Sequence, residues 1–105
     1  MQRIAFQLTL REGAEAAYDA SHQAVWPEML ELLTRAGIRE YSIFRRDRLL
    51  VLYMHVEDFE KSWSIVESDP VNTRWQAAMA PYFEPATGLL SGERFRMMRE
   101  VFYLA

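Results

Sequence analysis

Strand-like and helix-like patterns of apolar residues alternate along the chain, and their order restricts its fold more than any other feature. In residues 3–10, the apolar residues Ile4, Phe6 and Leu8 alternate with smaller or polar ones, a period of two that is typical of a half-buried strand. Strands of the same kind are predicted at three later segments: 39–46, 49–56 and 94–104. Between the strands we expect helices at 15–23, 27–36, 58–67 and 69–79.

Proline, glycine and aspartate set the expected helix boundaries. Pro27 disfavours helical geometry at Trp26 but suits the first turn of a helix, so a break is predicted near residues 24–26. Gly37 is a good C-terminal stop. The pair Asp69-Pro70 places a capping carboxylate directly before a proline, which is a strong helix start.

This order of elements predicts the fold class. Strand, helix, strand, strand, helix and strand form the split βαβ order of ferredoxin-like folds. Residues 1–105 are therefore expected to form one α+β domain, in which a four-stranded antiparallel sheet carries helices on one face. Both faces of the strand at 49–56 are largely apolar, so a second copy of the chain is expected to cover the face without helices.

Composition excludes several classes of function. The net charge is −3 with acids and bases interspersed, which argues against a nucleic-acid partner. The chain has no cysteine, and therefore neither a disulfide framework nor a thiol nucleophile. No apolar run is long enough to span a membrane, and no signal-peptide pattern is present. We expect a cytoplasmic protein without a membrane partner.

An aromatic or basic side chain occurs every four residues at Tyr18, His22 and Trp26. These side chains would share one face of a helix if the helix continued up to Pro27. Such a stripe either fills a core or lines a pocket for a small polar molecule. The imidazole of His22 exchanges protons near neutral pH, which makes it the best single candidate for catalysis, whereas a structural histidine is the alternative.

Other elements contribute further candidates. Tyr41, in the second predicted strand, could face the same space as the stripe, and Trp75 is flanked by polar residues that include Gln76. The usual signatures of cofactor sites are missing: the chain has no glycine-rich phosphate loop, no histidine pair with metal-ligand spacing and no nucleophile elbow. An enzyme built on these residues would most simply use acid–base chemistry without a metal or a cofactor.

Five segments together resemble the L-rhamnose mutarotase family across essentially the whole chain. They are RIAFQLTL, AAYDASHQAVWPEM, REYSIF, SDPVNTRWQ and REVFYLA. The resemblance implies a single mutarotase-like domain of ferredoxin-like fold that pairs through its sheets as a homodimer, a dimeric α/β barrel. It also implies a cofactor-free isomerase that interconverts the α and β anomers of a monosaccharide, a 6-deoxy-hexopyranose.

The same resemblance assigns roles to individual residues. His22 matches the position of the family's proton donor, and Tyr18 and Tyr41 match positions that contact the sugar. Trp75 matches the first residue of a sugar-contacting Trp-Trp pair, whereas the second position holds Gln76 here. This departure puts the identity of the sugar in doubt, because an amide replaces an apolar platform.

Two other classes of function remain open at this point. A cofactor-independent monooxygenase could use the same dimeric architecture, because fold alone does not determine the reaction. A non-enzymatic, ligand-binding dimer would explain the stripe from Tyr18 to Trp26 as packing.

Overall fold

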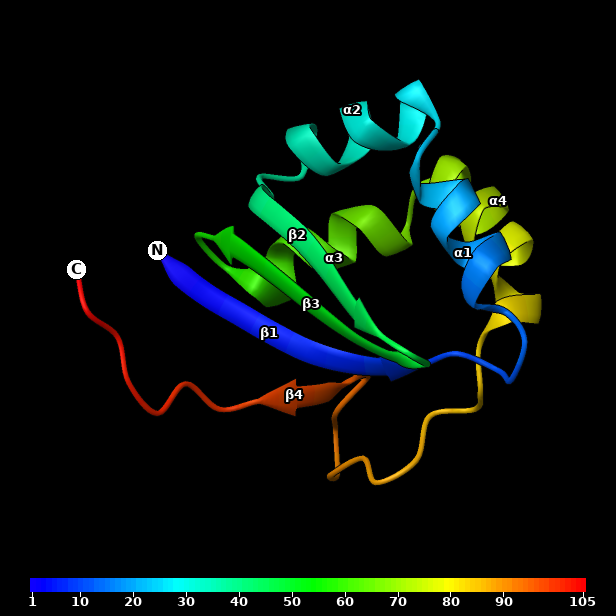
Figure 1. Cartoon of the computed structure of the whole chain (residues 1–105). Helices are drawn as coiled ribbons and strands as arrows, with labels where there is room; N and C mark the ends of the chain where they lie inside the picture. Colours follow the sequence, from blue (N-terminus) through cyan, green and yellow to red (C-terminus); the bar gives the residue numbers. More distant parts are fainter.

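A four-stranded antiparallel sheet and four α-helices make up the computed structural model, which describes all 105 residues (Figure 1). In chain order the elements are β1 (Gln2–Thr9), α1 (Glu15–His22), α2 (Pro27–Arg35), β2 (Arg39–Arg46), β3 (Leu49–Val56), α3 (Phe59–Glu67), α4 (Pro70–Met79), the 3-10 turn η1 (Ala80–Tyr82) and β4 (Arg96–Met98).

The sheet has the order β2-β3-β1-β4, and every neighbouring pair is antiparallel. Phe6 of β1 stands opposite Leu52 of β3 on one side and Met97 of β4 on the other. The four helices contribute buried residues to one core on a single face of this sheet. The predicted ferredoxin-like arrangement is therefore confirmed.

The helix boundaries follow from the local signals in the sequence. The carboxylate of Asp58 accepts a hydrogen bond of 3.1 Å from the backbone N–H of Lys61, and that of Asp69 accepts one of 2.9 Å from Val71. Trp26 has extended geometry with ψ of 134°, so α1 and α2 are separate helices, as predicted from Pro27.

Aromatic side chains form the centre of the core. Phe6, which is 1% exposed, stacks on Phe95 with the ring centroids 4.3 Å apart and meets the edge of Trp63 at 6.0 Å. Phe59 of α3 completes the group at 6.1 Å from Phe6. These contacts attach β1, α3 and the residue directly before β4 to one another.

No helix covers the opposite face of the sheet (Figure 1). Phe44 of β2 and Met98 of β4 are 63% and 44% exposed there. Between them on β3, the hydroxyl of Tyr53 lies 2.7 Å from Nε2 of His55, and both residues are half-buried. His55 therefore belongs to this face rather than to the core.

The prediction of a closing strand over 94–104 is wrong for most of its length. Only Arg96–Met98 pair with β1, and the chain beyond them extends away from the sheet (Figure 1). Side-chain contacts with Arg3 replace the ladder: its guanidinium binds both carboxylate oxygens of Glu100, at 2.6 and 2.7 Å, and lies 3.4 Å from the ring centroid of Tyr103. Alternation does not determine how far a ladder runs: β1 continues to Gln2, but its pairing with the last segment ends at Ala5 opposite Met98.

None of the helices combines the length and the apolar character that crossing a bilayer requires, and the longest of them has ten residues.

The aromatic core predicts a large loss of stability when its centre is removed. Phe6→Ala deletes a ring that touches three other rings, so the free energy of unfolding should fall by about 3–5 kcal/mol in urea titrations. Leu90→Ala, at a 73% exposed position, is the control and should change it by less than about 0.5 kcal/mol. A loss below about 1 kcal/mol for Phe6→Ala would contradict this description of the core.

Candidate active site

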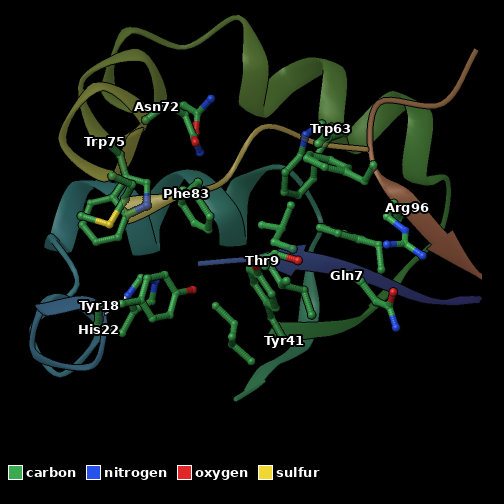
Figure 2. Close-up of a pocket in the computed structure, with 18 of the residues that line it drawn as sticks. Gln7, Thr9, Tyr18, His22, Tyr41, Trp63, Asn72, Trp75, Phe83 and Arg96 are labelled. Carbon is green, nitrogen blue, oxygen red and sulfur yellow. Dashed lines mark hydrogen bonds between the residues drawn. The ribbon is translucent and has the colours of Figure 1, made fainter. Parts of the chain in front are cut away.

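A cavity of about 960 Å³ lies between the sheet and the helices (Figure 2). Its wall is mostly apolar, with polar groups at a few places, which is the usual composition of small-molecule sites. Side chains reach it from the first helices, the sheet, α4 and the segment after η1. The polar and aromatic side chains around it include Thr9, Tyr18, His22, Tyr41, Asn72, Trp75, Gln76 and Phe83.

Helix α1 brings Tyr18 and His22 to this cavity on one face, as their spacing of four residues predicts. Their rings stack with centroids 4.0 Å apart and an interplanar angle of 27°. Tyr18 is 4% exposed, whereas His22 is half-buried and borders the cavity. Figure 2 shows the two rings together on one side of the cavity.

Two neighbours within α1 hold the imidazole of His22. Its Nδ1 atom lies 3.1 Å from the carbonyl oxygen of Tyr18 and 3.0 Å from Oγ of Ser21. Burial lowers the pKa of His22 below its usual value of 6.5, while the bond to the Tyr18 carbonyl and the charge of Asp19 act in the opposite direction. The neutral form of the ring therefore predominates at pH 7.

The two tyrosines of the cavity are neutral hydrogen-bond donors. Burial raises the pKa of Tyr18 to about 12, with a smaller contribution from the charge of Asp19. Burial also raises the pKa of Tyr41, which reaches the cavity from β2. Both phenols keep their protons at physiological pH and are suited to binding the oxygen atoms of a ligand.

Helix α4 supplies an indole and two amides. The ring of Trp75 meets His22 edge-on at 5.5 Å and Trp26 at 5.0 Å. Trp26 itself does not line the cavity, and its contact with the site is the packing against Trp75. Gln76 lines the cavity and donates a hydrogen bond of 3.2 Å from Nε2 to Oδ1 of Asn72, which is 7% exposed.

Charged groups that border the cavity are paired, with one exception. Glu84 lies 3.5 Å from Arg48, and Glu67 lies 3.3 Å from Arg94. Arg96 makes no ion pair. No three histidine, cysteine, aspartate or glutamate side chains lie close enough together to hold a metal ion.

Reasoning from sequence missed two residues of this site, Ser21 and Asn72. Ser21 directly precedes His22. Its hydroxyl points back along the helix toward the carbonyl of Tyr18, and in this position it contacts the imidazole of His22. Asn72 lies four residues before Gln76 in a helix, and this spacing was the signal that could have identified it.

Comparisons with known proteins agree with one another. The family model described as L-rhamnose mutarotase matches residues 3–104. An L-rhamnose mutarotase of Opitutus terrae is 33% identical over 99% of each chain, and an L-fucose mutarotase of Xanthomonas campestris is 34% identical over 100% of this chain and 90% of its own. The crystal structure of an L-rhamnose mutarotase from Formosa agariphila is similar with a TM-score of 0.79, at 27% identity, over 100% of each chain.

The lowered pKa of His22 predicts how stability depends on pH. In the window between its folded-state pKa and 6.5, the unfolded chain binds more protons than the folded one, so the free energy of unfolding decreases as the pH falls through that window. NMR titration of the His22 ring should give a pKa below 6.5, with His55→Gln used to assign the resonances. In unfolding titrations, His22→Asn should lose this part of the pH dependence. A His22 pKa at or above 6.5 would contradict the burial described above.

Proposed function

This chain belongs to the L-rhamnose mutarotase family, and we propose that it interconverts the α and β anomers of L-rhamnose or a closely related aldose. Its membership makes it an isomerase. The observation that carries the proposal is the place of His22: the residue that resembles the family's proton donor borders a cavity together with Tyr18, Tyr41 and Trp75. We propose that the reaction uses no metal and no organic cofactor.

The chemistry of anomer exchange fits these residues. The ring must open at the hemiacetal, the exposed aldehyde must rotate, and the ring must close again. Opening places a proton on the ring oxygen and removes one from the anomeric hydroxyl. His22 would deliver the proton to the ring oxygen, a step for which a positioned acid contributes about a hundred- to ten-thousand-fold in rate.

The remaining side chains are suited to hold a pyranose. The indole of Trp75 would cover the C–H face of the sugar, while the neutral phenols of Tyr18 and Tyr41 bind its hydroxyl groups. Gln76 adds an amide that Asn72 orients through a hydrogen bond of 3.2 Å. Gln76 is exposed, and its amide offers both a donor and an acceptor to a sugar hydroxyl group, whereas an indole at this position offers a donor alone. A sugar with a hydroxyl group at this place, L-rhamnose or a relative, would therefore suit the site.

A homodimer is part of the proposal. The sheet face opposite the helices exposes Phe44 and Met98, beside the half-buried Val51. Pairing of this face with the same face of a second copy would remove these side chains from water and is the isologous contact of a two-fold dimer.

The proposed function predicts that His22→Ala abolishes most of the catalysed exchange while the fold is retained. NMR exchange spectroscopy on L-rhamnose and L-fucose should show a rate about 10²–10⁴-fold lower than that of the wild type. Asn72 and Trp75 remain in place in this variant, so binding of the sugar should change less than the rate. If His22→Ala exchanged anomers as fast as the wild type, with an unchanged circular dichroism spectrum, the assignment of His22 would be wrong.

The proposed dimer predicts a particle with twice the mass of one chain in size-exclusion chromatography with light scattering at micromolar concentration. Phe44→Asp would place a charge in the apolar contact and should shift the protein toward monomer. Leu90→Asp, at another exposed apolar position, is the matched control and should remain dimeric. A monomeric wild type would contradict the proposed pairing of the sheets.

A further inference from the structure

The contacts of Nδ1 determine which nitrogen of His22 carries the proton. The hydroxyl of Ser21 lies 2.7 Å from the carbonyl oxygen of Tyr18 and 3.6 Å from Sδ of Met79. Its oxygen and the carbonyl oxygen of Tyr18 lie 3.0 and 3.1 Å from Nδ1 of His22. Because a carbonyl oxygen only accepts hydrogen bonds, Nδ1 carries the hydrogen of the neutral imidazole.

The other nitrogen is consequently left with a free lone pair. In this tautomer Nε2 is an acceptor, and no protein group forms a hydrogen bond with it, because all hydrogen bonds of the ring involve Nδ1. His22 borders the cavity. The neutral ring therefore offers a base, rather than an acid, to whatever binds there.

No second base is free around the imidazole. From α1, Tyr18 and Asp19 face it: the phenol is protonated, and the carboxylate of Asp19 binds Arg45 of β2 through two bonds of 2.6 and 2.7 Å. From β2, Tyr41 is a protonated phenol as well. Helix α4 presents Trp75, which does not titrate.

The two carboxylates farther along the cavity wall are also occupied. Glu67 is paired with Arg94, and Glu84 is paired with Arg48. The polar groups that remain are amides, hydroxyls and the guanidinium groups of Arg48 and Arg96, none of which accepts a proton near neutral pH. The proton of the anomeric hydroxyl therefore has one group to go to, which is His22 itself.

The geometry of a pyranose allows one nitrogen to serve both oxygens. The anomeric oxygen and the ring oxygen are bonded to the same carbon, so they lie closer together than two hydrogen-bonded heavy atoms. An atom within hydrogen-bond distance of one can move to the other with a small tilt of the ring.

We propose that His22 alone carries the proton from the anomeric hydroxyl to the ring oxygen. This inference rests on the proposed mutarotase function and supplies its missing proton acceptor. The O–H bond of the anomeric hydroxyl breaks as Nε2 takes the proton. The C–O bond to the ring oxygen then breaks as the carbonyl forms, and the imidazolium returns the proton from Nε2 to that oxygen. Ring closure on the other face of the aldehyde reverses the steps, and the enzyme ends in its starting state.

The pH dependence of kcat/KM distinguishes this shuttle from an acid and a base on separate residues. The shuttle begins with a neutral ring, so kcat/KM should rise with pH as His22 loses its proton and then stay level to about pH 9, after subtraction of the spontaneous rate. A profile that falls above the pKa of His22, or a bell-shaped one, would overturn the shuttle.

Two variants and one spectrum complete the test. Glu67→Gln and Glu84→Gln remove the remaining carboxylates of the cavity and should each leave kcat/KM within about threefold of the wild type. A loss above about tenfold in either would identify a second base and refute the shuttle. The ¹⁵N NMR spectrum at pH 7 should show the hydrogen on Nδ1, and a hydrogen on Nε2 would contradict the inference.

These outcomes separate the shuttle from the function on which it rests. Anomer exchange with a falling or bell-shaped profile would overturn the shuttle alone. Absence of catalysed exchange by the wild type on every aldose would overturn the proposed function, and the shuttle with it.

Discussion

One helical turn, from Tyr18 to His22, holds the imidazole on which the rest of the site depends. The carbonyl oxygen of Tyr18, in the last turn of α1, lies 2.7 Å from Oγ of Ser21 and 3.1 Å from Nδ1 of His22. The same turn stacks the phenol on the imidazole at 4.0 Å. A few consecutive residues of α1 therefore determine the orientation, the tautomer and the partial burial of the His22 imidazole. The sheet and the other helices form the cavity beside it.

The surrounding fold supplies that cavity because the core is filled at one end and open at the other. Phe6, Trp63 and Phe95 pack closely where β1, β4 and α3 meet. Toward α1 and α4, a cavity remains between the helices and the sheet, and its mostly apolar wall carries polar groups at a few places. Trp26 does not line the cavity, but its ring packs edge-on against that of Trp75, which does.

Most of the fold could be predicted from the sequence, since apolar periods and capping residues act locally. Asp69-Pro70 begins α4, and Pro27 separates α1 from α2, as expected. The last strand was overestimated because alternation does not determine how far a ladder runs: pairing with β1 ends at Met98, and the side chain of Arg3 binds Glu100 beyond it. Within the site, Tyr18, His22, Tyr41, Trp75 and Gln76 do line one cavity. The contributions of Ser21 and Asn72 depend on where their side chains turn, which composition and spacing do not specify.

The most direct test of this account is a crystal structure of the protein with L-rhamnose bound. The account predicts the sugar in the cavity, with Nε2 of His22 within hydrogen-bond distance of the ring oxygen and the indole of Trp75 against the C–H face. It would be contradicted by a sugar bound outside this cavity, or by one whose ring oxygen lies beyond the reach of His22.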